Sequence, residues 1–178
     1  MFSRILTKYQ RLLNNKIFNA LVFMKIQIIM FGKTAKQFFT ESEKFYLDRI
    51  KPFSKVEYIV LPEEKISKTI NGEQVKDREA EKFFAKYNEA NFLIACDPQG
   101  KHFTSEKFTE VLEKTKITHS GVTFVIGGAL GLSQKILGKS HQKISFSSMT
   151  FPHDLFRTML LEQIYRTFMI SGNREYHK

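Results

Sequence analysis

The chain has 178 residues, a length that suits one domain with a substantial apolar core and is short for two. It is 42% hydrophobic and contains 18 phenylalanines, which excludes a disordered chain. Its 28 Lys and Arg against 18 Asp and Glu give a net charge of +10, so the surface field attracts polyanions such as RNA or an acidic membrane.

Residues 1–23 differ from the rest of the chain because they carry four cations and no acidic residue. Three interpretations stay open: a leader from an upstream start codon with Met24 as the true start, an organelle presequence, or an accessory helix that contacts RNA. A secretory signal is disfavoured, since no continuous apolar centre precedes a small-residue cleavage site. We therefore expect a basic extension over 1–23 and one domain over 24–178.

From Met24 onward, short β-like runs alternate with longer helical patterns, which is typical of an α/β domain with a largely parallel sheet flanked by helices. The predicted strands are 25–31, 56–61, 91–96, 121–126 and 143–147. The predicted helices are 35–50, 73–87, 105–116, 133–139 and 154–170. Pro152 before the last helix and Gly172 after it stand where those residues are favoured.

The stretch 62–72 is polar and ends in Asn71-Gly72, so it is the most loop-like part of the chain and is predicted to end in a turn. Cys96 is a single cysteine, which excludes an internal disulfide and a multi-cysteine zinc site. A reducing compartment fits this, and we expect a cytoplasmic protein, or an organellar one if 1–23 is a presequence. No apolar run of about 18 residues is present to span a bilayer.

A glycine cluster, Ile126-Gly127-Gly128-Ala129-Leu130-Gly131-Leu132-Ser133, follows a β-like run and precedes a helix. Backbone often approaches a ligand closely at such a place. The cluster is neither a P-loop nor a dinucleotide-binding turn, and a plain strand-to-helix connection stays an alternative. The first strand ends without the acidic glycine turn of an ordinary Rossmann-type methyltransferase, which counts against that architecture.

The segment 145–153, Ser-Phe-Ser-Ser-Met-Thr-Phe-Pro-His, leads from a predicted strand into the last helix. Its backbone groups and apolar side chains could form a pocket for an adenine ring and a sulfonium-bearing chain. An ordinary loop with helix-entry chemistry is the alternative.

Two groups of polar residues are candidates for chemistry. His153 could be a base, with Arg157 four residues later on the same helix face, although a solvated helix surface is the default for both. Tyr176 could stack on a base and Lys178 could meet a phosphate, if the chain end does not fray. His141 has no second ligand at metal-site spacing, so it is predicted as a surface residue and no metal is expected.

Taken together, these motifs resemble the ribosomal RNA large subunit methyltransferase H family in order and spacing. The resemblance covers 24–178 and rests on Met24-Lys25-Ile26-Gln27-Ile28, the glycine cluster, 145–153, Arg157, Glu162-Gln163-Ile164-Tyr165-Arg166 and Tyr176-His177-Lys178. It implies a SPOUT fold with a C-terminal trefoil knot, S-adenosyl-L-methionine (SAM) bound in the knot, and a homodimer that completes the active site. The implied donor-binding residues are Cys96, Gly127, Phe146, Ser147, Ser148, Met149, Thr150 and Phe151.

The resemblance also implies methyl transfer to N3 of a pseudouridine in large-subunit rRNA, with the ribosome or that rRNA as the partner. Because that imide proton is weakly acidic, we expect Arg157 to stabilise the developing anion and His153 or His177 to receive the proton. Tyr176 and Lys178 would position the RNA. The alternatives are a SPOUT enzyme for another RNA such as tRNA, and a non-enzymatic ribosome-binding module. A phosphate-binding hydrolase is disfavoured by the missing P-loop lysine.

Overall fold

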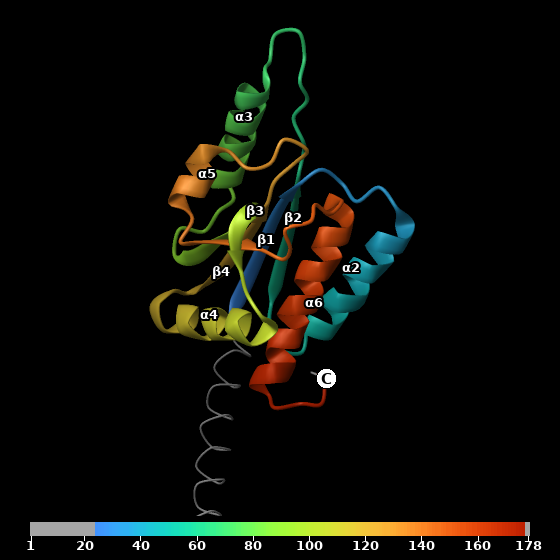
Figure 1. Cartoon of the computed structure of the whole chain (residues 1–178), viewed down its shortest axis with the longest axis vertical. Coiled ribbons are helices and arrows are strands. Elements are labelled where there is room, and N and C mark those ends of the chain that lie inside the picture. Colours follow the sequence, from blue (N-terminus) through green and yellow to red (C-terminus); the bar gives the residue numbers. More distant parts are fainter. Residues whose placement is uncertain (1–23, 177–178) are drawn as a thin grey trace, which may run out of the picture.

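The computed structural model describes residues 24–176, over which strands and helices alternate (Figure 1). The strands are β1 (Lys25–Phe31), β2 (Val56–Leu61), β3 (Asn91–His102), β4 (Gly121–Ile126) and β5 (Gln142–Ser145). The helices are α2 (Gln37–Ile50), α3 (Gly72–Phe84), α4 (Ser105–Thr118), α5 (Gln134–Lys139) and α6 (His153–Ser171). The predicted α/β class is confirmed.

The strands form one sheet in the order β2-β1-β4-β3-β5, and every neighbouring pair is parallel. β1 and β4 lie in the interior of the sheet and are almost entirely buried, as expected for strands covered on both faces. Parallel pairing places the carboxyl ends of all five strands at one edge, where the loops that follow them gather.

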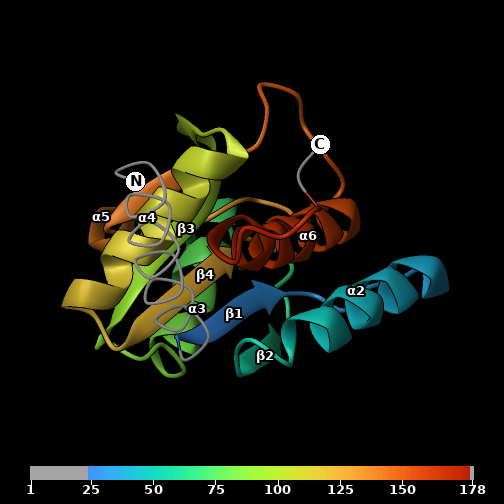
Figure 2. The same ribbon diagram turned by 90° about the horizontal axis from the view of Figure 1, so that it is seen from below.

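Helices cover both faces of the sheet (Figure 2). On one face, apolar side chains of α2, α4 and α6 pack with alternate residues of β1 and β4, including Ile28 and Phe124. On the other face, α3 and α5 pack against the intervening residues, including Ile29 and Val125. The alternation follows from the two-residue period of a strand, which sends successive side chains to opposite faces.

The amino-terminal half of the sheet contains a chain of buried polar side chains. Thr123 Oγ1 donates to Gln27 Oε1 at 2.9 Å, and Asn91 Nδ2 donates to Thr123 Oγ1 at 3.0 Å. Gln27 Nε2 donates in turn to the Lys86 carbonyl at 3.1 Å. These side chains hydrogen-bond to one another and to neighbouring groups, so their burial costs little.

Two strands differ from the prediction: β5 covers Gln142–Ser145 and not 143–147, and β3 continues beyond Cys96 to His102. The sequence Asp97-Pro98-Gln99-Gly100 reads as a turn, yet β3 resumes its pairing with β5 after a register shift between Cys96 and Lys101. A Cβ at Gly100 would lie 2.5 Å from the carbonyl carbon of Ile144, so only glycine permits this close crossing.

Helix boundaries follow the capping residues. Asn71, predicted as part of a turn, caps α3 instead: its side chain accepts from Gln74 N, and the Gln74 side chain accepts from Asn71 N. Pro152 and Gly172 flank α6 as predicted.

Candidate functional site

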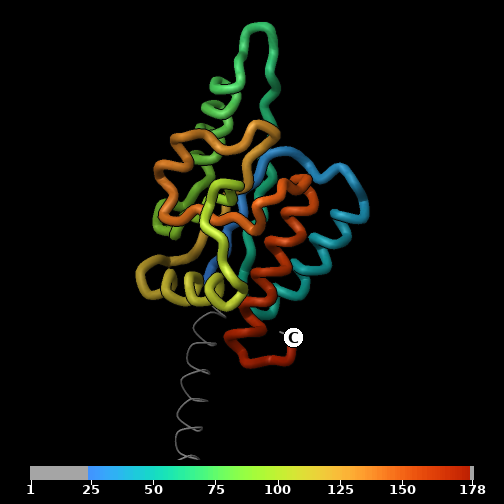
Figure 3. Tube along the Cα trace, viewed as in Figure 1, coloured from blue at the N-terminus to red at the C-terminus, as the bar shows by residue number. Residues whose placement is uncertain are grey.

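A cavity of about 240 Å³ lies at the carboxyl ends of β4 and β5 and beside Cys96, where the pairing of β3 with β5 shifts register. Its lining residues come from three segments far apart in sequence, namely 96–98, 126–132 and 144–151, and from the start of α6. The backbone course of these segments can be followed in Figure 3. Ligands of open parallel sheets bind at this edge, so the position of the cavity suits a ligand site.

The glycine cluster forms a tight turn at one wall. Gly131 N donates to Gly128 O at 2.9 Å, and Gly131 adopts a left-handed φ of 77°. A Cβ at Gly131 would meet nothing within 4 Å, so this residue borders open space. A Cβ at Gly127 would instead lie 2.7 Å from the Gly131 carbonyl carbon, which makes Gly127 a requirement of the turn itself.

The connection from β5 to α6 forms the opposite wall and is held by its own hydroxyl groups. Ser145 Oγ donates to Ser147 O at 2.8 Å, and Met149 N donates to Ser147 Oγ at 3.0 Å. The Phe146 ring packs against Phe156 with ring centroids 4.9 Å apart. These bonds hold the connection in shape, and the wall brings aromatic rings, backbone groups and the Thr150 side chain to the cavity.

Of the eight residues implied for the donor, seven line this one cavity: Cys96, Gly127, Phe146, Ser147, Met149, Thr150 and Phe151. Ser148 is not among its lining residues. Burial, with a contribution from Asp97, raises the pKa of the Cys96 thiol, so this cysteine is a protonated part of the wall and not a nucleophile.

His153 and Arg157 lie at the start of α6 in very different environments. His153 is exposed and borders the cavity. Arg157 is only 2% exposed and donates to Phe31 O at 2.7 Å, Gly32 O at 2.8 Å and Thr34 Oγ1 at 2.9 Å. The default interpretation of Arg157 as a solvated residue is therefore wrong: its guanidinium fastens α6 to the end of β1.

The chain end folds back onto α6 as far as Tyr176. The Tyr176 ring packs edge-on against Tyr165, the Arg166 guanidinium lies over it, and its hydroxyl donates to Glu162 Oε1 at 3.3 Å. Burial, together with Tyr46 and Glu162, raises the pKa of Tyr176 to about 12. Within one chain Tyr176 is thus not brought to the cavity, and His177 and Lys178 lie outside the described residues.

A larger cavity of about 390 Å³ shares Ile144, Ser145 and Phe146 with the first and lies between α2, α4 and α6. Its polar groups bond to one another: Ser105 Oγ donates to Gln163 Oε1 at 2.8 Å, and Gln163 Nε2 donates to Glu162 at 2.6 Å. A polar ligand would have to displace these bonds, so the smaller cavity suits it better despite its size.

His141 lies outside both cavities. His141 is exposed, as predicted, and its Nδ1 accepts from Leu93 N at 2.9 Å, a bond that supports β3. Among residues 24–176, no group of three or more His, Cys, Asp or Glu is arranged to hold a metal. Across the same residues, no helix has both the length and the apolar character to cross a membrane.

Comparison with known proteins decides the family. Residues 24–177 match the family model described as "Predicted SPOUT methyltransferase". The chain is 40% identical over 159 residues to the ribosomal RNA large subunit methyltransferase H 1 of Clostridium perfringens, covering 87% of this chain and 100% of that protein. The chain belongs to the ribosomal RNA large subunit methyltransferase H family of SPOUT methyltransferases.

Two further similarities agree with this membership. The methyltransferase H of Clostridium botulinum strain Hall is also 40% identical, over the same shares of the two chains. A probable methylase family protein from Haemophilus influenzae has the same fold, with a TM-score of 0.51 and 11% identity over 86% of this chain and 70% of that one.

Several lining residues of this SPOUT family member were missed by sequence reasoning, among them Asp97, Pro98 and Phe156. The signal for the first two was available: they follow a buried parallel strand, and the carboxyl ends of such strands converge on the ligand. Phe156 gave no such signal, since its spacing on α6 equally suits the core.

Proposed function

We propose that this protein transfers a methyl group from SAM to large-subunit ribosomal RNA, at N3 of a pseudouridine. Family membership and the names of the relatives support the reaction and the RNA. The observation that carries the proposal is the meeting of the glycine turn with the 144–151 segment around one cavity.

The chemistry of the cavity fits the donor. Leu132, Phe146 and Phe151 give apolar walls for an adenine ring, and the backbone of the glycine turn can approach it closely. The Asp97 carboxylate gives the cationic part of the donor an opposite charge. When bound, SAM supplies a methyl group activated by its sulfonium.

The tasks left to this chain are to remove the imide proton of the acceptor and to stabilise the resulting anion. We assign the proton to a ring nitrogen of His153, which borders the cavity, or to His177. Arg157 provides positive charge from a buried position fixed by three hydrogen bonds, and such preorganisation avoids reorientation during reaction.

Partners and location follow from the same membership and stay predictions. We propose a homodimer bound to the ribosome, in the cytoplasm, with the trefoil knot of the SPOUT fold. Tyr176, His177 and Lys178 would position the RNA. Because Tyr176 lies beside Glu162 in its own chain, we assign the contact with the acceptor to the tail of the second protomer.

The test is to incubate the purified protein with radiolabelled SAM and, separately, intact ribosomes, naked rRNA and bulk tRNA. Mass spectrometry then maps the labelled nucleoside. We expect label in 3-methylpseudouridine of large-subunit rRNA. Label in tRNA would mean that tRNA, and not rRNA, is the substrate. Absence of label with retained ribosome binding would favour a non-enzymatic ribosome-binding module.

A second experiment addresses the base. His153→Ala and His177→Ala are compared with His102→Ala, an exposed histidine outside the cavity, in single-turnover reactions. General base catalysis contributes about 100-fold or more, so one of the first two variants should slow by that factor. Wild-type rates in both would exclude a histidine base.

A further inference from the structure

Two carboxylates lie against the glycine turn, and neither is among the residues that line the cavity. Glu63, in the connection between β2 and α3, accepts from Ala129 N at 3.0 Å. A Cβ on Gly128 would lie 3.0 Å from Glu79 Oε1 and 3.2 Å from Glu63 Oε1, so both carboxylates press against this residue. The turn that borders the cavity is therefore supported by two acids from elsewhere in the fold.

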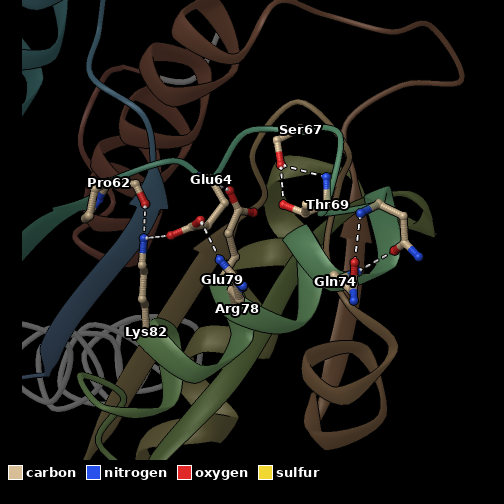
Figure 4. A network of polar contacts seen from close by, with 9 residues as sticks. Pro62, Glu64, Ser67, Thr69, Gln74, Arg78, Glu79 and Lys82 are labelled. Atoms are coloured by element: carbon tan, nitrogen blue, oxygen red, sulfur yellow. Dashed lines mark hydrogen bonds and ion pairs between the residues drawn. The ribbon is translucent and has the colours of Figure 1, made fainter.

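Glu79 projects from α3 and holds the connection that carries Glu63. Its side chain is 3% exposed, and its Oε1 accepts from Glu64 N at 3.1 Å (Figure 4). Lys82 pairs with the Glu64 side chain and donates to Pro62 O at 3.0 Å. The backbone on both sides of Glu63 is thus fastened to α3, which fixes where the Glu63 carboxylate meets Ala129.

The proximity of the Glu63 and Glu79 carboxylates is electrostatically unfavourable. Burial raises the pKa of Glu79, and the nearby Glu63 carboxylate adds to this. The hydrogen bond from Glu64 N lowers the pKa but does not cancel the rise. Two neighbouring carboxylates repel, and the burial of Glu79 costs free energy that an apolar residue would not. The Glu63 bond from Ala129, however, fixes the backbone of the pocket-forming turn in one orientation.

We propose that Glu63 and Glu79 are positioning residues of the methyl-donor site: α3 holds the glycine turn in the shape that keeps the donor cavity open. They act through Gly128 and Ala129, not by contact with the donor. This inference rests on the proposed function, since it names the support of that same site.

Calorimetric SAM binding to the full chain tests the proposal, with Glu63→Ala, Glu79→Ala, Glu63→Gln and Glu79→Gln as variants. Loss of one such hydrogen bond to a charged group should raise the Kd of both Ala variants by about tenfold. The Gln variants keep an acceptor oxygen, so their Kd should stay within about threefold of wild type. Glu81→Ala, an exposed residue of the same helix, is the matched control.

Two further readouts separate positioning from general stability. At saturating SAM the single-turnover rate of Glu63→Ala should stay within about twofold of wild type, so that the loss appears in Kd and not in transfer. In the donor-free protein, amide exchange at Ala129 should accelerate by about tenfold in Glu63→Ala and not in Glu81→Ala.

A double-mutant cycle keeps the proposal falsifiable if an Ala variant folds poorly. Gly128→Ala places a Cβ 3.0 Å from Glu79 Oε1 and should itself raise the Kd. In the Glu79→Ala background the same change should cost less, because the nearest of the atoms that it meets is gone.

Additive effects in this cycle, or unchanged Kd in folded Glu63→Ala and Glu79→Ala, would overturn the positioning role while wild type still bound SAM. Failure of the wild type to bind SAM would instead remove the proposed function.

Discussion

The two ends of the parallel sheet differ in how their residues fill the space between the strands and loops. At the amino end, Thr123 hydrogen-bonds to both Gln27 and Asn91, and all three side chains are buried. At the carboxyl end, the chain turns through Gly128–Gly131 and leaves a cavity lined by backbone and aromatic rings. The buried hydrogen bonds at the amino end stabilise the fold, whereas the cavity at the carboxyl end is available to a ligand.

The largest effect should come from Arg157→Ala at the carboxyl end. The variant leaves two buried carbonyl groups and Thr34 without their donor, so the free energy of unfolding should fall by about 3 kcal/mol. Denaturant unfolding measures this, and methyl transfer should be lost as well. Unchanged stability would mean that Arg157 does not fasten α6 to β1.

At the amino end of the sheet, Thr123→Val should lower stability without lowering SAM affinity. It removes the donor to Gln27 and the acceptor for Asn91, so the free energy of unfolding should fall by about 2 kcal/mol. SAM affinity should stay within about twofold of wild type, since the change is far from the cavity. A large rise in Kd would show that the two ends are coupled.

Gly131→Ala should have a smaller effect on stability and a clear one on binding. The left-handed φ of 77° penalises alanine by about 1 kcal/mol. The new methyl group enters the open space beside the turn, so the Kd for SAM should rise by about tenfold. Thermal unfolding and calorimetry separate the two effects. Wild-type affinity would place the donor away from this turn.

The smallest effect concerns pH. Burial raises the pKa of Glu79 in the folded state, so ionised Glu79 destabilises the fold above that pKa, and the penalty disappears as pH falls. Glu79→Gln should therefore be as stable as wild type or more stable at pH 7.5, by less than about 1 kcal/mol. This advantage should vanish near pH 4, where the unfolded carboxyl also protonates. If the stability advantage of Glu79→Gln grew as the pH fell, the pKa of Glu79 would not be raised in the folded state.

Much of the fold could be predicted because its determinants are local. Strands β1, β2 and β4 are short apolar runs bounded by polar segments, and their limits were predicted to the residue. The β3 extension was not, because Asp97-Pro98 resembles a turn and the pairing that overrides it comes from β5, more than forty residues away.

The site was predictable only in part, for a related reason. Spacing placed His153 and Arg157 on one face of a helix, yet what covers that face depends on β1, over 120 residues away in sequence, so the burial of Arg157 could not be seen. Glu63 and Glu79 likewise belong to a loop and a helix, and only the folded chain brings both carboxylates to Gly128.

The central claim is that the methyl donor lies between the glycine turn and the connection from β5 to α6. Photo-crosslinking of methyl-labelled SAM, followed by peptide mapping, tests it most directly. Label should appear within 127–132 or 147–151, the segments that line the smaller cavity and not the larger one. Label confined to 103–108 or 158–163, which line the larger cavity and not the smaller one, would contradict it.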